Sequence, residues 1–215
     1  MEIMMKNFIV KSMSPNGDSA YELMCIWQTI RRIRRFGRQI PTAVIDASIP
    51  SEQIIAMRNA IADEQEKQIS NGNTALQTLI VQSLIDWSRS PLENNGRNAE
   101  VQQAPQSLPA GASENEWLYS PDALDLHSAL VRTGQNEVFA ESGEMEAFSL
   151  MLQAPLAIYL PGYTELYPQS VQLGPDNDEY LVGICNGSHY FLAVPRRWFI
   201  NQQRQQEGIW SILSQ

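Results

Sequence analysis

Two residues far apart in the sequence could form a nucleophile and its base. Ser19 stands where the turn Pro15-Asn16-Gly17-Asp18 meets an apolar helical pattern, and His189 opens the last apolar strand pattern, directly after Asn186-Gly187-Ser188. A side chain at a helix N-terminus lies beside free N–H groups and the positive end of the helix dipole, which stabilise an anion. Beside an imidazole, such a side chain predicts nucleophilic catalysis.

This arrangement favours sulfur at position 19. A helix terminus and an imidazolium lower the pKa of a thiol enough to hold a thiolate at neutral pH, and the same N–H groups can bind an oxyanion. A serine alkoxide is too basic to persist in the same way. A nucleophile at a helix start, followed far downstream by a histidine on a strand, is the plan of papain-like cysteine proteases. We therefore expect Ser19 Oγ to lie close to the His189 ring.

The other candidate groups have weaker cases. Cys25 lies six residues further along the same helical pattern, on its apolar side, where a thiol is normally buried and inert. His127 lies in the middle of another helical pattern, which favours a structural role. Serine is also a common N-cap residue, so a non-catalytic interaction module in which Ser19 only caps its helix is an alternative.

Hydrophobic periodicity predicts helices first and strands afterwards. A helix is predicted over residues 20–33, a second one capped by Ser51, a third opened by Asn73 or Thr74, one starting at Pro121, and a short one over 143–152. Strands are predicted in the stretches NFIVKSM, PLAIYL, YTELYPQSVQL, EYLVGIC and HYFLAV, with a hairpin at Asn186-Gly187. This order predicts an α+β fold with helices packed on an antiparallel sheet.

Arginine is concentrated at the end of the first helix. The stretch RRIRRFGR, residues 31–38, contains five arginines. Cations stabilise a helix C-terminus, and Gly37 can end the helix. The alternative is a site for an anion or an acidic partner.

Length and composition restrict the protein class. The chain has 215 residues, of which 43% are hydrophobic, so we expect one domain over 1–215 with a flexible polar loop at 90–114. The net charge of −9 argues against nucleic acid as a partner, and no apolar run is long enough to span a membrane, so we expect neither partner. Two cysteines and two histidines predict no disulfide framework, no metal cluster and no cofactor, in a reducing compartment. We expect a monomer.

Three segments resemble a known protease family. Asn16-Gly17-Asp18-Ser19 resembles the D-G-[DN]-C motif of ovarian tumour (OTU) family deubiquitinases, with serine in the place of the nucleophilic cysteine. Ser188-His189-Tyr190 resembles the H-[YW] strand of that family, and Trp117 with the helix over 121–132 is similar to its W-G…E-L…A-L segment. The order of these segments covers roughly residues 7–195.

The resemblance implies a papain-like fold and a cysteine-type deubiquitinase that hydrolyses isopeptide bonds of ubiquitin conjugates. Ubiquitin or polyubiquitin is then the partner, and the divergence resembles that of bacterial effectors or viral proteases acting in the cytoplasm, including that of a host cell. The implied site consists of Ser19 and His189 as catalytic residues and Asn16 in an orienting or oxyanion role. Gly17 and Asp18 belong to the oxyanion loop, and Tyr190 and Trp117 are implied to bind substrate.

Departures from the family pattern leave alternatives for the residue that orients the imidazole and for the reason that serine stands at position 19. Many members carry Asp or Asn two residues after the histidine, where this chain has Phe191, so Asn7 or Asn16 orients the imidazole, or the site is a dyad. Ser19 replaces cysteine either because the chain is an inactivated Cys-to-Ser form or because it is a natural pseudoenzyme that binds ubiquitin. A papain-like glutamine deamidase or acyltransferase using the same dyad is a further alternative.

Overall fold

The computed structural model describes residues 7–14, 18–89, 117–133, 140, 142–168, 180–186 and 189–199. The predicted flexible loop at 90–114 lies outside these residues, as do Asn16 and Gly17. The prediction of a single domain over 1–215 stays a prediction.

The helices follow the apolar periodicity of the sequence. They are α2 (Ser19–Arg35), α3 (Ala43–Asp46), α4 (Ser51–Ser70), α5 (Thr74–Arg89), α8 (Pro121–Thr133) and α9 (Ser142–Leu152). Asn73 Oδ1 accepts a hydrogen bond from Leu76 N–H at 3.1 Å, which confirms the predicted start of α5. Gly37 follows α2 at a φ of 64°, a left-handed conformation in which glycine ends helices without strain.

The predicted cap of α4 is wrong by one residue. Pro50 is the N-cap residue of α4, and Ser51 is the first helical residue without a capping hydrogen bond from a side chain. The backbone of Pro50 is extended, with ψ at 146°, as is typical of the residue just before a helix.

The strands form one five-stranded sheet. They are β1 (Phe8–Ser12), β2 (Leu156–Leu160), β3 (Tyr163–Tyr167), β4 (Leu181–Cys185) and β5 (Tyr190–Pro195), in the order β1-β5-β4-β2-β3. The predicted pairing of β4 with β5 is confirmed, with Cys185 opposite Tyr190. The α+β class is confirmed, but the sheet is not purely antiparallel: β4 lies beside β2 on the side away from β3, and the pair β2–β4 is parallel.

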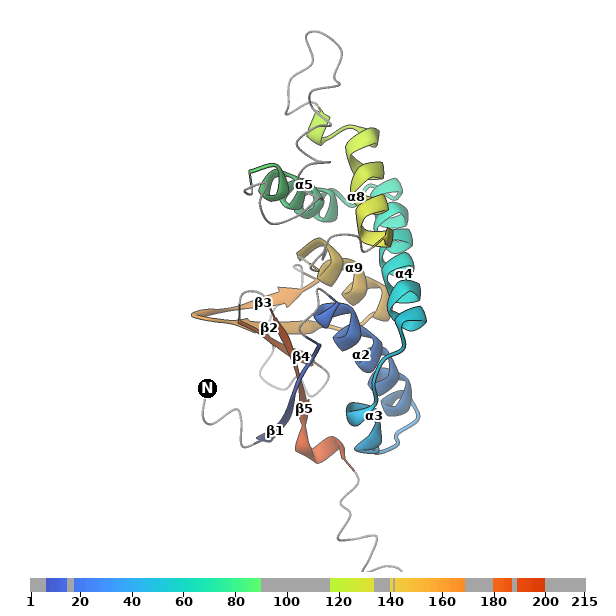
Figure 1. The fold of residues 1–215 in the computed structure, drawn as a ribbon, viewed down its shortest axis with the longest axis vertical. Helices are drawn as coiled ribbons and strands as arrows, with labels where there is room; N and C mark the ends of the chain where they lie inside the picture. Colours follow the sequence, from blue (N-terminus) through green and yellow to red (C-terminus); the bar gives the residue numbers. More distant parts are fainter. Residues whose placement is uncertain are drawn as a thin grey trace, which may run out of the picture.

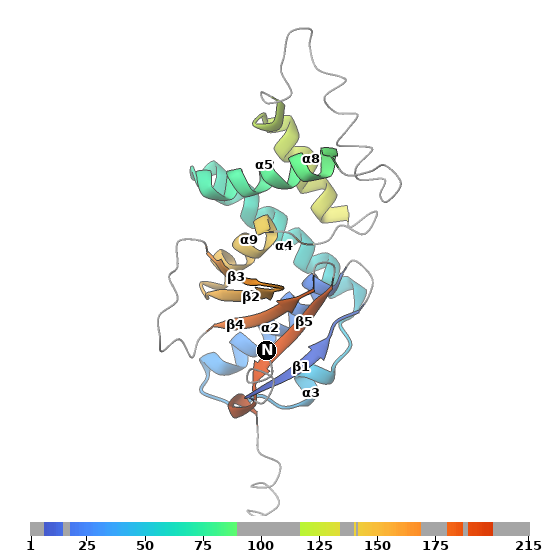
Figure 2. The ribbon, with the colours of Figure 1, turned by 90° about the vertical axis from the view of Figure 1, so that its left-hand side faces the viewer.

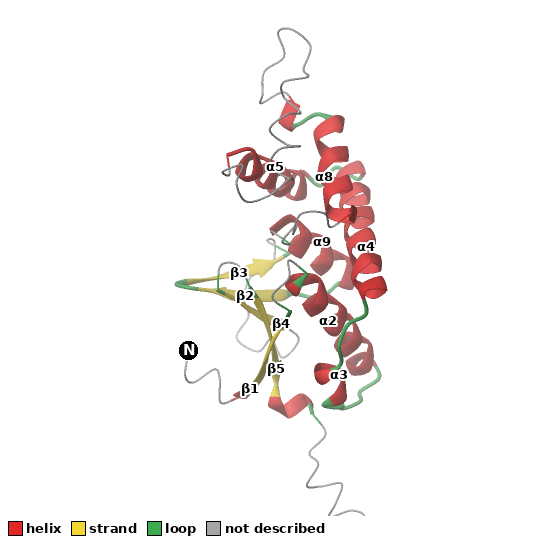
Figure 3. Cartoon of the chain, in the orientation of Figure 1, coloured by secondary structure: helices red, strands yellow, loops and turns green. Residues whose placement is uncertain are grey.

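Helices cover one face of this sheet. In Figures 1 and 3, α2, α3, α4 and α9 lie to the right of the strands, and α5 and α8 lie above α9. The main core lies between α2, α4, α9 and the sheet, and a second cluster of buried residues lies under α5 and α8. Figure 2 looks onto the opposite face of the sheet, called the outer face below, which no described helix covers.

Trp27 fixes α2 against the sheet. Its side chain is buried, and its Cη2 lies 3.2 Å from where a Cβ on Gly183 of β4 would stand. The same Cβ would lie 2.9 Å from Ile158 Cδ1. The missing side chain at Gly183 therefore lets the helix and the sheet approach closely, and this contact determines how far α2 stands from the strands.

Candidate functional site

One end of the sheet carries His189 and lies next to the segment that leads to Ser19. β1 and β5 are antiparallel, with Ser12 opposite Phe191, so the end of β1 lies beside the start of β5. Met13 N–H extends this pairing by donating to Tyr190 O at 3.3 Å. Because α2 begins at Ser19, shortly after β1, the helix start returns to the end of the sheet where β5 begins.

His189 is held by a hydroxyl and by an aromatic ring. Its Nε2 lies 2.9 Å from Ser12 Oγ, and its ring meets the Phe191 ring edge-on with centroids 4.9 Å apart. Its backbone N–H donates to Asn186 Oδ1 at 3.0 Å. Ser12 was not among the residues predicted to orient the imidazole.

Asn7 does not orient His189. Asn7 precedes β1, whose first residue, Phe8, is paired with Pro195 at the far end of β5. The length of the strand therefore separates Asn7 from the imidazole, whereas Ser12 lies beside it. The other predicted orienting residue, Asn16, lies outside the described residues.

The bond from Ser12 defines which ring nitrogen of His189 could act as a base. When Nε2–H donates to Ser12 Oγ, Nδ1 carries no proton and can accept one from a nucleophile. A serine oxygen is neutral, so it orients the ring but stabilises an imidazolium less than a carboxylate does. The arrangement supports general base chemistry with weaker charge stabilisation than a carboxylate would give.

Ser19 is buried and its hydroxyl is unpaired. The residue is 1% exposed, and Oγ has no hydrogen-bond partner, so the expected close contact with His189 is not a hydrogen bond. Ser19 is also no N-cap: Asp18 occupies that position, and its side chain makes no capping bond. Leaving a hydroxyl buried without a partner costs about 1–3 kcal/mol. Helix capping therefore does not explain serine at this position.

Ser12, which holds the His189 ring, and α2 lie on different faces of the sheet. Ser12 comes two residues after Val10 and therefore lies on the same outer face, whereas α2 covers the inner face. The residues that follow Ser12 are tied to α2, because Ser14 N–H donates to Glu22 Oε2 at 2.8 Å and Ser14 Oγ donates to Glu22 Oε1. A continuous set of contacts thus joins the imidazole to the first turn of α2.

Arg58 is a site residue that the sequence reasoning missed. Its Nη2 lies 2.6 Å from Asp18 Oδ1, its Nη1 donates to Val131 O at 3.4 Å, and its guanidinium stacks 3.9 Å from the centre of the Tyr21 ring. Arg58 thereby ties the start of α2 to α4 and α8. Asp18, which was predicted to belong to an oxyanion loop, is in the structure the partner of this arginine.

The sequence contained a signal for Arg58. It lies four residues after Ile54 and three before Ile61, on the apolar stripe of α4, and it is 3% exposed. A charged residue on the buried stripe of a helix requires a partner, because an unpaired buried charge is strongly unfavourable.

Cys25 is unsuited to nucleophilic chemistry, as expected. The residue is buried, and its Sγ lies 3.7 Å from Gln53 O. Burial, reinforced by the negative charge of Glu22, raises the pKa of this thiol to about 11. The thiol is therefore protonated at neutral pH and cannot serve as a thiolate nucleophile.

The two residues predicted to bind substrate point elsewhere. Tyr190 packs against the main core and donates its hydroxyl to Ala140 O at 3.2 Å, and burial raises its pKa well above the ordinary value. Trp117 is 5% exposed and belongs to the cluster under α5 and α8, not to the end of the sheet near His189. Both are core residues in this structure, because their aromatic rings fill space between elements.

His127 has the structural position expected of it. Its side chain is fully buried, and its Nε2 lies 3.6 Å from Oε1 of the equally buried Glu144. The pair joins α8 to α9 inside the helical part of the molecule.

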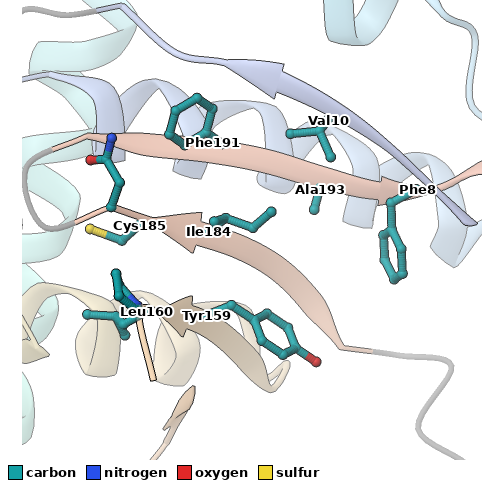
Figure 4. A pocket seen from close by; sticks show the side chains of 10 residues that line it. Phe8, Val10, Tyr159, Leu160, Ile184, Cys185, Phe191 and Ala193 are labelled. Atoms are coloured by element: carbon teal, nitrogen blue, oxygen red, sulfur yellow. The ribbon is translucent and has the colours of Figure 1, made fainter. Parts of the chain in front are cut away.

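An apolar pocket opens on the outer face next to His189. Its volume is about 420 Å³, and Figure 4 shows its lining: Phe8, Val10, Tyr159, Leu160, Pro161, Ile184, Cys185, Asn186, Phe191 and Ala193. Phe191 contacts both the pocket and the His189 ring. The pocket can therefore accept an apolar group beside the imidazole. No group of three metal-ligating side chains occurs within the described ranges.

Comparison of the chain with known proteins finds similarity to solved structures. No protein-family model matches the chain, and no curated protein does. A crystal structure of an OTU deubiquitinase from Wolbachia pipientis wMel is 13% identical with a TM-score of 0.45, over 94% of this chain and 96% of that one. The viral OTU domain protease from Taggert virus is 10% identical with a TM-score of 0.43, over 89% and 81%. A deubiquitinase of Legionella pneumophila is 11% identical with a TM-score of 0.40, over 95% and 85%.

Proposed function

We propose that the end of the sheet around Ser19 and His189 is the active-site region of a cysteine-type, OTU-like deubiquitinase, which this chain carries in an inactive form with serine at the nucleophile position. The observation that carries the proposal is the unpaired, buried hydroxyl of Ser19 at the first turn of α2. A thiol is a weak hydrogen-bonding group, so this environment suits cysteine better than serine, and unlike Cys25 the position lies at a helix start, where free N–H groups stabilise a thiolate.

Each neighbouring group then has a role. The N–H groups of the first turn of α2 stabilise a thiolate and afterwards the oxyanion of the tetrahedral intermediate. His189 pairs with the thiolate and protonates the leaving lysine amine, while Ser12 holds its ring at Nε2. Arg58 fixes the helix start through Asp18. The substrate is the C-terminal tail of ubiquitin joined to a lysine.

The test restores sulfur. We expect Ser19→Cys to react covalently with a ubiquitin probe bearing a C-terminal electrophile and to cleave ubiquitin chains, because a helix terminus and an imidazolium ionise a thiol but not a hydroxyl. His189→Ala in that background removes the partner of the thiolate and should abolish labelling. Cys25→Ala in the same background is the matched control: the pKa of Cys25 is about 11, so labelling should persist.

Two other outcomes would identify different functions. If Ser19→Cys is not labelled while the unaltered chain binds ubiquitin, a natural ubiquitin-binding pseudoenzyme is the better proposal. If neither protein engages ubiquitin, the deubiquitinase proposal is wrong, and a papain-like glutamine deamidase or acyltransferase that uses the same residues takes its place.

A further inference from the structure

A cluster of arginines lies at the end of α2 remote from Ser19. It combines the C-terminal residues of α2 and the turn after it with the 3-10 helix η3 (Arg196–Trp198). Arg34 joins the two segments, because its guanidinium lies 5.2 Å from the centre of the Trp198 ring, and Ile40 N–H donates to Trp198 O at 2.7 Å. The end of α2 and η3 both lie toward the lower end of the molecule in Figures 1 and 2. We call this region the basic end: Arg31, Arg32, Arg34, Arg35, Phe36, Arg38, Arg196 and Arg197.

The contacts that the structure gives for Arg31, Arg34 and Arg35 are with uncharged groups of the fold. Arg31 and Arg35 donate to the backbone oxygens of Gln153 and Leu152 at the end of α9, as cations at a helix C-terminus do. Within the described part of the chain, no carboxylate lies within 4.0 Å of any of four exposed guanidinium groups: Arg32, Arg34, Arg38 and Arg196.

Other described cations are paired with carboxylates, as Arg58 is with Asp18, or donate to backbone oxygens, as Lys11 does. Lys67 Nζ lies 2.9 Å from Glu64 Oε2, and Arg132 contacts Asp63 and Glu66 at 2.6 and 2.7 Å. Among the described residues, the basic end thus contains four guanidinium groups without a carboxylate partner, on a chain whose net charge is −9. The stretches 31–38 and 196–197 hold seven of the 15 Lys and Arg residues.

The basic end also contains apolar groups placed next to its cations. A pocket of about 390 Å³ is lined by Gln28, Arg31, Arg32, Arg35, Phe36, Met151 and Leu152. Phe36 lies at the rim of this pocket and is 74% exposed. Guanidinium groups therefore border an opening whose remaining wall is largely apolar, which matches a ligand with an anionic group attached to a hydrocarbon.

We propose that the basic end binds the surface of a membrane that contains anionic phospholipids, with a lipid phosphate at the arginine-lined pocket and Phe36 in the headgroup region. Guanidinium groups bind phosphate oxygens in a bidentate manner, which suits arginine better than lysine. An exposed aromatic ring beside cations gains burial at the boundary between headgroups and acyl chains. Nucleic acid offers phosphates and bases that can stack on Phe36, but no alkyl chain for the wall formed by Met151 and Leu152.

The net charge does not oppose this proposal. The residues of α2 from Ser19 to Ile30 separate the helix start from the basic end by about 18 Å. Charges on a surface are screened over about 8 Å at physiological ionic strength, so acidic groups further away repel the membrane weakly.

The proposal replaces our sequence-based expectation of no membrane partner, which considered only spanning segments. None of the helices that the structure describes is long and apolar enough to cross a membrane. The proposal concerns binding at the surface alone, and it does not depend on the proposed deubiquitinase function.

Co-sedimentation with vesicles tests the proposal. We expect the protein to bind vesicles of phosphatidylcholine mixed with phosphatidylserine, and to bind phosphatidylcholine alone poorly. The double variant Arg32→Gln/Arg38→Gln should weaken binding about tenfold or more, and higher salt should weaken binding by the unaltered protein. Phe36→Ser should weaken binding several-fold at unchanged charge.

A matched control removes the same charge elsewhere. Lys67→Gln/Arg132→Gln takes two cations from the helical part of the molecule and should leave vesicle binding unchanged, with circular dichroism confirming that every variant is folded. Equal binding to both kinds of vesicle, or equal loss in both double variants, would overturn the proposal. The proposal would also be wrong if soluble glycerol phosphate displaced the vesicles with an affinity equal to theirs. Binding to single-stranded RNA or to polyglutamate, without binding to vesicles, would contradict it as well.

Discussion

At the scale of single residues, two buried serines provide a direct comparison. Ser19 and Ser149 are each 1% exposed, but Ser149 Oγ donates to Ala154 O at 2.8 Å while Ser19 Oγ has no partner. Removing a paired hydroxyl leaves a buried carbonyl without its donor, whereas removing an unpaired one relieves a desolvation cost. The same substitution should therefore have opposite effects at the two positions.

We predict that Ser19→Ala and Ser19→Cys each raise the free energy of unfolding by about 1 kcal/mol, and that Ser149→Ala lowers it by about 1–2 kcal/mol. Urea denaturation followed by circular dichroism measures all three. Equal destabilisation by Ser19→Ala and Ser149→Ala would mean that the Ser19 hydroxyl has a structural bond in solution.

Ser12 gives a second prediction at this scale, which rests on the proposed function. In the Ser19→Cys background, Ser12→Ala should slow labelling by the ubiquitin probe on the order of tenfold to a hundredfold, because the imidazole loses the contact that aligns it. Ser12→Asp should keep or raise the rate, because a carboxylate holds the ring and favours the imidazolium. Identical rates for Ser12→Ala and its parent would exclude a positioning role.

Sequence reasoning identified part of this site. A turn before a helix and a histidine after a hairpin are local signals, so Ser19 and His189 were visible as candidates. The contact between Ser12 and His189 joins residues 177 positions apart and depends on the register of β1 against β5, which no local pattern encodes. Arg58 was overlooked because arginine is rarely buried, and its partner Asp18 lies 40 positions away in the sequence.

At the scale of elements, the approach of α2 to β4 depends on the absence of a side chain at Gly183. A Cβ there would stand 2.9 Å from Ile158 Cδ1 and 3.2 Å from Trp27 Cη2, both in the main core. Neither group can move away easily, because protein interiors are close-packed.

We predict that Gly183→Ala lowers the free energy of unfolding by about 1–3 kcal/mol, as overpacking of a core does. Thermal denaturation measures the effect. Ile158→Val removes the Cδ1 atom that the new Cβ would meet, and alone should cost about 0.5–1.5 kcal/mol.

The double variant distinguishes overpacking from other causes. Combined with Ile158→Val, Gly183→Ala should cost less than it does alone, which is a favourable coupling between neighbours. Strictly additive costs would show that the predicted clash is not what destabilises the single variant.

The elements themselves were largely predictable. Apolar residues at helical spacing and the strand patterns near the C-terminus gave the types and approximate bounds of α2, α5, α9 and β5, because these signals lie within each segment itself. The parallel pair β2–β4 was missed, since the direction of pairing depends on where the chain returns to the sheet and not on the composition of either strand.

At the scale of the whole molecule, the order of the strands brings the two ends of the described chain together. β1 comes directly before α2, and its only neighbour in the described sheet is β5, the last strand. Leu192 and Val194 of β5 are also fully or almost fully buried in the main core. The sheet and the core under α2 therefore both depend on a segment near the end of the sequence.

This pairing has a consequence for the order in which the protein folds during synthesis. A ribosome releases β1 and α2 before β5, which emerges only after nearly all the other described elements, so the contact between Ser12 and His189 cannot form until then. We predict that a fragment ending at residue 186 lacks cooperative unfolding and is cleaved rapidly by proteases, because β1 and β4 keep unpaired edges and the core lacks β5. A fragment of this length that unfolds cooperatively would show that β5 is not needed to stabilise the remaining elements. A nascent chain would therefore carry an incomplete site, with no imidazole beside its helix start, until β5 has left the ribosome.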